Sequence, residues 1–209
     1  MLGRALARIL FFRETKSYDA ALLEIDNAGR SLLGLNTDTI ERLPAAGLKS
    51  VLGSDPALLR SRMYTAGVLL KEKAEILDLM DNESETAALY VKSLRLMLEE
   101  IEGIEELDGG KGIANVDAVI EKLKEYDLPD DLKRQLISYF GHTGRYDRSE
   151  DLIFEMVESD PEFVPEGISF YEKLLAKSDS ELENGRLPRN EVQDALEELR
   201  RKKQDVGKT

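Results

Sequence analysis

The stretch that decides the fold runs from Asp131 to Pro161 and reads DLKRQLISYFGHTGRYDRSEDLIFEMVESDP. Apolar residues recur in it every three or four positions, which is typical of helices that bury one face. Glycines at 141 and 144 interrupt this period, and the final proline ends it. The spacing therefore predicts two short helices packed back to back, with the following residues inward: Leu132, Leu136, Ile137, Phe140, Leu152, Ile153, Met156 and Val157.

The turn between the two helices and the end of the second carry a specific set of residues. Gly144, Tyr146, Ser149 and Pro161 stand at the spacing of glycine, tyrosine, small residue and closing proline in a tetratricopeptide repeat. The glycine permits a tight turn, and the small serine lets the helices approach closely. The stretch thus resembles such a repeat. The resemblance implies an all-α fold, a right-handed α-α superhelix of helical hairpins with a C-terminal capping helix.

Two weaker copies of the pattern precede this one. They cover residues 2–33 and 67–101. In the first copy Tyr18 and Ala21 keep the spacing of the tyrosine and the small residue, while Lys16 replaces the turn glycine. The stretches between the copies are each long enough for one more degenerate helical pair, so we expect repeats along the chain.

These copies, with the best one at 131–161, predict a single elongated helical-repeat domain over residues 1–203, followed by a tail at 204–209. The whole chain is also similar to an uncharacterised bacterial family of such helical proteins. This likeness is strongest at 132–158 and 171–199. Membership of that family implies no activity.

Start and stop signals predict the remaining helices. Asp55 and Pro56 are a capping side chain followed by proline, and they begin a long helix over Pro56–Met80. Pro44 breaks residues 37–53 into short helices. The last helix starts after the proline at 188 and should cap the array with these residues inward: Val192, Ala195, Leu196 and Leu199.

Composition excludes several classes of chemistry. The 209 residues include no cysteine and one histidine, His142, so disulfides, thiolate ligands and a two-histidine zinc site are excluded. The net charge of −13 disfavours general nucleic-acid binding. No apolar run approaches the roughly 20 residues that cross a bilayer, so we expect no membrane insertion. The sequence implies no cofactor, and we expect a cytoplasmic protein.

Two polar stretches have features of a phosphate-binding or a metal-binding site, but a structural interpretation is favoured for each. Residues 107–112 are rich in glycine, yet no hydroxyl follows Lys111 and no strand precedes the glycines, so a connection between helices is favoured over a phosphate-binding loop. The acidic residues of Glu99–Glu106 fit no calcium loop. A solvated helix face is favoured there over a carboxylate site for magnesium or calcium.

The leading functional hypothesis is a non-catalytic scaffold that binds a protein or peptide partner in a concave groove. The resemblance implies that the first helix of each hairpin lines this groove, with Lys71 and Arg134 exposed. The alternative is a small-molecule-binding or carboxylate-dependent hydrolytic helical protein, because distant acids can converge in a fold. The sequence is also compatible with a homodimer of this chain. No catalytic or metal residue is assigned, and the candidate peptide-binding residues are Lys71, Glu75, Asp78, Arg134, Ser138 and His142.

Overall fold

The computed structural model describes residues 1–99 and 102–206, and this part of the chain is helical without a strand. The predicted all-α class is therefore confirmed. The chain divides into two compact units, Met1–Leu128 and Pro129–Thr209. A single elongated domain over residues 1–203 stays a prediction.

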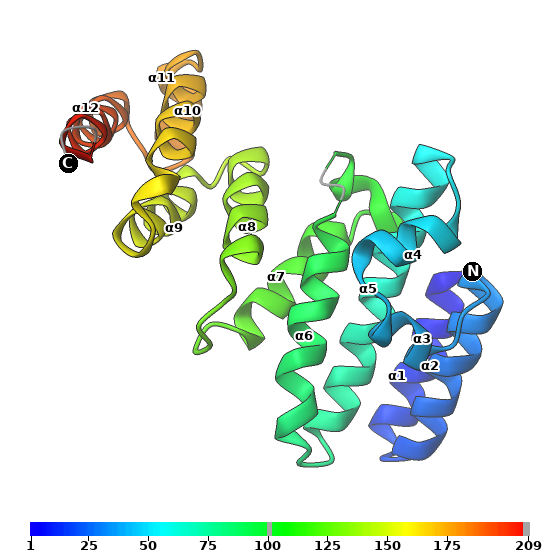
Figure 1. The fold of residues 1–209 in the computed structure, drawn as a ribbon. Helices are drawn as coiled ribbons and strands as arrows, with labels where there is room; N and C mark the ends of the chain where they lie inside the picture. Colours follow the sequence, from blue (N-terminus) through cyan, green and yellow to red (C-terminus); the bar gives the residue numbers. More distant parts are fainter. Residues whose placement is uncertain (100–101, 207–209) are drawn as a thin grey trace. The chain divides into compact units, whose positions relative to one another are not determined.

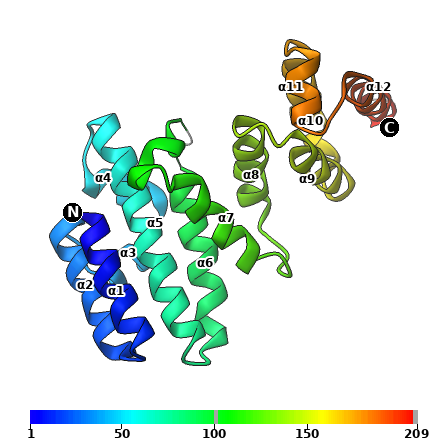
Figure 2. The same cartoon turned by 180° about the vertical axis from the view of Figure 1, so that it is seen from behind.

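Unit 1 is built around one long helix, α5, which packs against α6 along its length and also against α2 and α4 (Figures 1 and 2). The core between the first hairpin and this helix includes Ile9, Ile25, Leu69 and Ile76, all fully buried. The elements of unit 1 are α1 (Leu2–Glu14), α2 (Tyr18–Leu33), α3 (Thr37–Arg42), α4 (Ala45–Leu52), α5 (Pro56–Asp78), α6 (Glu83–Met97), the 3-10 helix η1 (Ile104–Gly109) and α7 (Gly112–Lys122).

The helix signals in the sequence act as expected in unit 1. The Asp55 side chain accepts a hydrogen bond of 2.9 Å from the Leu58 N–H, and Pro56 is the first helical residue of α5. Pro44 separates α3 from α4, and Gly53, with φ of 113°, ends α4. Local capping and turn chemistry therefore sets these boundaries.

The pairing of α5 with α6 depends on a glycine inside a helix. The Ser93 hydroxyl of α6 donates a buried hydrogen bond of 2.7 Å to the Gly67 carbonyl of α5. A Cβ atom at position 67 would lie 2.6 Å from Met97 Cγ and 2.8 Å from the Ser93 carbonyl oxygen. The two backbones can approach this closely because residue 67 has no side chain.

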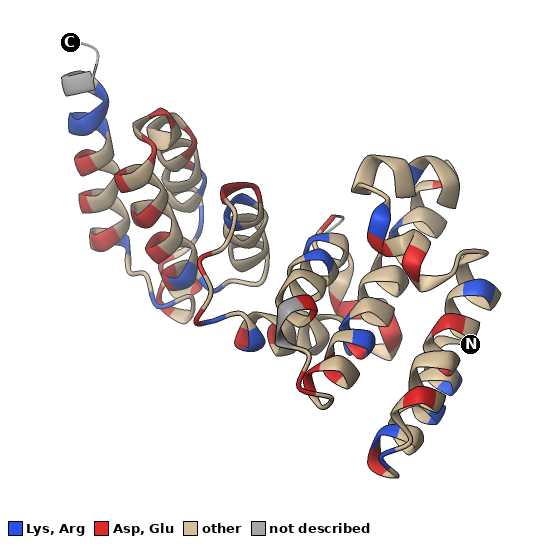
Figure 3. Cartoon of the chain, turned by 60° about the horizontal axis from the view of Figure 1, so that its bottom comes forward, with Lys and Arg blue, Asp and Glu red and all other residues tan. Residues whose placement is uncertain are grey.

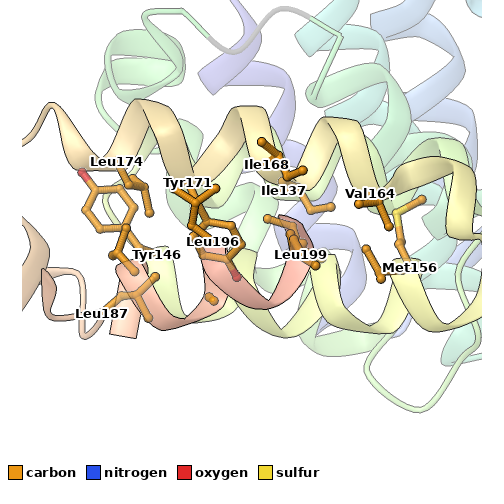
Figure 4. Close-up of a cluster of buried hydrophobic side chains, with 14 of the residues drawn as sticks. Ile137, Tyr146, Met156, Val164, Ile168, Tyr171, Leu174, Leu187, Leu196 and Leu199 are labelled. Carbon is orange, nitrogen blue, oxygen red and sulfur yellow. The ribbon is translucent and has the colours of Figure 1, made fainter. Parts of the chain in front are cut away.

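Unit 2 has a core of its own, in which α9, α10 and α12 supply most of the side chains (Figure 4). Tyr171 and Leu199 are fully buried in it. The predicted inward residues of the last helix, at positions 192, 195, 196 and 199, are all buried, which confirms that pattern. The elements are α8 (Asp130–His142), α9 (Tyr146–Ser159), the 3-10 helix η2 (Pro161–Phe163), α10 (Val164–Leu175), α11 (Asp179–Asn184) and α12 (Arg189–Val206).

Four helix ends share one turn geometry. A residue with φ between 54° and 71° follows α1, α5, α8 and α11, and the next N–H donates to the carbonyl five residues back, at 2.8–3.1 Å. This is the six-to-one hydrogen bond of a Schellman cap. The predicted positive φ of Gly144 is confirmed. The other three positions are Lys16, Asp81 and Arg186.

The division into repeat copies stays a prediction. The copy at 67–101 would begin inside α5, and its last residues, 100–101, lie outside the described residues. The acidic residues of 99–106 do not share one helix face, because α6 ends at Met97 and η1 begins at Ile104. Glu100 lies outside the described residues. Of the predicted tail, 204–206 belong to α12, and 207–209 also lie outside the described residues.

None of the helices in the described ranges is both long enough and apolar enough to span a bilayer.

Candidate functional site

The best candidate site is a groove in unit 2 between α8 and α10, with α9 beneath it. Its volume is about 510 Å³, within the range of about 300–1,000 Å³ that ligand sites usually have. Ser138 of α8 and Glu166, Ser169 and Lys173 of α10 are exposed, so the groove is open to solvent. The lining residues are Arg134, Ile137, Ser138, Gly141, Ile153, Phe163, Glu166, Ser169, Phe170, Lys173, Leu174 and Lys177.

One end of the groove is charge-neutralised. Arg134 Nη1 donates to Glu166 Oε1, and Nη2 lies 3.8 Å from Asp160 Oδ2. The guanidinium stacks 4.6 Å from the centre of the Phe163 ring. Because two carboxylates and an aromatic face hold this arginine, it is fixed in position but already paired.

The other end carries two lysines on successive turns. Lys177 donates a hydrogen bond of 3.2 Å to Glu181, and this bond raises the pKa of the ammonium. Glu181 also accepts from the Ser178 backbone N–H in a capping box, which holds the pKa of the Glu181 carboxyl down at about 2. Lys173 is exposed, and within the described ranges its ammonium has no acidic partner. This lysine is therefore available to a bound anion.

Three of the six sequence-predicted residues lie in unit 1, and the expectation that Lys71 is exposed was wrong. Lys71 is only 8% exposed. Its Nζ lies 2.8 Å from Glu72 Oε1 and 3.4 Å from Glu75 Oε1, and Arg13 of α1 pairs with the same Glu75. Asp78 pairs with a lysine of α7 at 2.8 Å. The physical reason is that the neighbouring helices enclose α5, so these charges bind one another.

The other three predicted residues lie on α8. Arg134 and Ser138 line the groove, whereas the exposed His142, in the last turn of α8, does not. Sequence reasoning missed the α10 side of the groove, including Phe170 and Lys173. Their spacing from Glu166, four and seven residues, is helical and could have revealed a second lining face on α10.

A second, shallower groove of about 600 Å³ lies between α9 and α12 and is mainly acidic. Figure 3 shows acidic residues along the helix that leads to the C-terminus, followed by basic ones. Beside this groove Tyr171 donates a hydrogen bond of 3.2 Å to Glu150 Oε1. Burial raises the pKa of the Glu150 carboxyl to about 6. Its charge therefore changes between mildly acidic and neutral pH.

No group of three or more histidines, aspartates or glutamates in residues 1–99 and 102–206 is arranged to hold a metal ion.

The fold and the groove together define an all-helical protein with an open, partly apolar and partly basic surface site. The model of a family of unknown function, DUF6483, matches residues 1–204, and the chain belongs to that family. No curated protein and no solved structure matches the chain. Membership of an uncharacterised family is thus confirmed, while the likeness to tetratricopeptide repeats stays a prediction.

Proposed function

We propose that this chain is a non-catalytic scaffold that binds a segment of a partner protein in the groove between α8 and α10. The observation that carries the proposal is the combination of an apolar floor with an exposed lysine, Lys173, on an open rim, where no acidic residue of the described ranges pairs with it. Ile137, Phe163 and Leu174 can take an apolar side chain of the partner. Lys173 can then pair with a carboxylate beside it. The segment that fits has an apolar anchor flanked by aspartate or glutamate.

The same proposal includes a tetratricopeptide-like arrangement. Its support is the recurrence of one turn geometry after α1, α5, α8 and α11, including the turn at Gly144. In α9 the fully buried Ser149 donates a hydrogen bond of 3.0 Å to the Ile137 carbonyl of α8. A small residue thus stands where the two helices of the hairpin meet. In such arrays the first helices of hairpins line the ligand groove, and in this proposal α8 and α10 are those helices.

The alternative from the sequence, a carboxylate-dependent hydrolytic or small-molecule-binding protein, has one observation in its favour. Glu150 has a pKa of about 6, which suits a general acid or base near neutral pH. Its oxygen is already engaged by Tyr171, and the neighbouring Asp151 and Glu191 are exposed. The open α8–α10 groove therefore supports the scaffold function better. The cytoplasmic location stays a prediction.

The test is selection of short random peptides displayed on phage against the full chain. We expect enrichment of sequences with an aromatic or aliphatic residue next to aspartate or glutamate. A selected peptide should bind Lys173→Glu about 10-fold or more weakly, since a hydrogen bond to a charged group contributes about 1.5–3 kcal/mol. Added salt should weaken the wild-type complex.

The matched control is Lys111→Glu, because Lys111 is an equally charged, exposed residue in unit 1. It should bind the selected peptide like the wild type. Two results would show that this groove does not recognise an acidic segment. One is enrichment of peptides without acidic residues, and the other is equal binding of the selected peptide to Lys173→Glu and to the wild type.

A further inference from the structure

Helix α1 presents an apolar stripe that no other element covers within the described part of the chain. Phe11 is 59% exposed and Leu10 is 41% exposed, whereas Ile9 on the opposite face is completely buried. Ala7 is also exposed. Large exposed apolar side chains that cluster on one face of a helix commonly mark an interaction surface.

The stripe has the spacing of a helix-pairing seam. Arg4, Ala7, Phe11 and Glu14 are all exposed and are separated by three, four and three residues. Steps of three and four residues keep side chains in line along one face, as in the seams through which helices pair. These four residues with Leu10 are here called the α1 face.

Phe11 is the central side chain of the α1 face, and contacts within its own chain hold its ring in position. The Phe11 and Phe12 rings pack edge to face, with their centres 5.7 Å apart. Phe12 in turn packs against the buried core of unit 1. An ordered aromatic ring loses little conformational freedom on binding, so it suits the centre of an interface.

The α1 face is complementary to itself when two copies pair antiparallel. A helix rises 1.5 Å per residue, so with the crossing point at Ile9 residues at equal steps on either side come level. Phe11 then lies opposite Ala7 of the second copy, a large side chain against a small one. Arg4 lies opposite Glu14 of the second copy. Within the described ranges neither Arg4 nor Glu14 has an ion-pair partner in its own chain.

The geometry points to a second copy of this chain as the occupant of the α1 face, in a two-fold symmetric, antiparallel α1–α1 pair. Each contact then occurs twice. An anionic lipid surface is the less suitable occupant, because the α1 face carries Arg4 and Glu14, one charge of each sign, and so has no net positive charge to attract it. One helix pair buries less than the roughly 1,600 Å² of a standard interface. The dimer is therefore weak and depends on concentration.

The first test is sedimentation of the full chain over a wide range of concentrations. The wild type should change from monomer to dimer as concentration rises. Phe11→Glu should weaken the dimer on the order of 30-fold or more, as for a central interface aromatic. The matched control is Val51→Glu on α4, because Val51 is 57% exposed. It should dimerise like the wild type, and circular dichroism should show equal helicity in all three proteins.

The second test is a charge exchange across the proposed pair. Arg4→Glu alone and Glu14→Arg alone should each weaken the dimer several-fold, since each places like charges opposite one another twice. The variant with both substitutions, Arg4→Glu and Glu14→Arg, should dimerise nearly as strongly as the wild type, because both ion pairs form again with their charges exchanged.

Three results would overturn the inference. These are a wild type that stays monomeric at every concentration, a dimer that Phe11→Glu leaves unchanged, and a double variant no stronger than the single ones. Binding of a monomeric wild type to vesicles of anionic lipid, lost in Phe11→Glu, would assign the α1 face to a membrane instead.

Discussion

Replacing Gly67 by alanine gives the sharpest test of how unit 1 is held together. The new methyl group would lie 2.6 Å from Met97 Cγ, 2.8 Å from the Ser93 carbonyl oxygen and 3.1 Å from the Met97 nitrogen. The Met97 side chain can rotate away, but the other two atoms belong to the backbone of α6. Helix α6 must therefore shift outward from α5.

The expected cost follows from three contributions. Overpacking a close contact costs about 1–3 kcal/mol. Moving α6 also breaks the buried hydrogen bond from Ser93 to the Gly67 carbonyl, and leaving such groups unpaired costs about 1–3 kcal/mol. Alanine regains about 1 kcal/mol over glycine in a helix interior. The free energy of unfolding of unit 1 should therefore fall by about 1–5 kcal/mol.

The assay is urea unfolding followed by circular dichroism, with hydrogen exchange of α5 and α6 to locate the effect. Gly3→Ala on α1 is the matched control, because a Cβ atom there would meet nothing within 4 Å. The control should leave stability equal or slightly higher. If Gly67→Ala shifts the midpoint as the control does, and exchange in α6 is unchanged, the close approach of the two helices does not depend on glycine.

The other predictions concern a turn, a titrating carboxyl and a buried charge. Gly144→Val should lower the free energy of unfolding by about 1–2 kcal/mol or more, because φ is 71° at that position; an unchanged urea midpoint would refute this. The Glu150 pKa is raised from 4.5 to about 6, so its stabilising contribution is complete below pH 4.5 and is lost as the pH rises through about 6. Glu150→Gln keeps the acceptor for Tyr171, so above that range it should be more stable than the wild type by on the order of 1 kcal/mol after solvent screening, with no difference at acidic pH in urea titrations. Lys71→Glu should cost about 3–5 kcal/mol because it breaks a buried ion pair with Glu72; an unchanged thermal midpoint would argue against that pair.

Local signals in the sequence were sufficient for much of the fold. The α8–α9 hairpin was predicted because Gly144 supplies a left-handed turn and Ser149 a close contact, and both are features of a few neighbouring residues. The start of α5 was predicted for the same reason, since Asp55 and Pro56 act on the first turn alone. By contrast, Lys16 adopts φ of 54° without any glycine or asparagine to signal it. The hydrogen bond of 2.8 Å from the Ser17 N–H to the Phe12 carbonyl closes this turn, and α1 and α2 pack against each other on either side of it.

The groove could be predicted only in part, because a groove needs two helices and the sequence pattern indicated lining residues on only one of them, α8. On α8, Arg134 and Ser138 were assigned from a hairpin whose inward face was clear. On α10, Phe170 and Lys173 were not considered. Which face of α10 turns toward α8 depends on how the two pack, and apolar periodicity alone does not determine it.

Lys71 was predicted to be exposed but is buried in α5, and the burial of that helix is the reason why the candidate groove lies in unit 2. A helix at the edge of a layer buries one face, so polar residues between its apolar positions reach solvent. In α5 every residue from Met63 to Glu72 is buried, whatever its side of the helix. Lys71 therefore pairs with Glu72 and Glu75, and these charges are not available to a partner. Helices α8 and α10 each keep an exposed face, with Ser138 and Lys173 on it. A carboxylate-bearing partner can therefore reach Lys173, which no acidic residue of the described ranges pairs with, but not the paired charges of the buried α5.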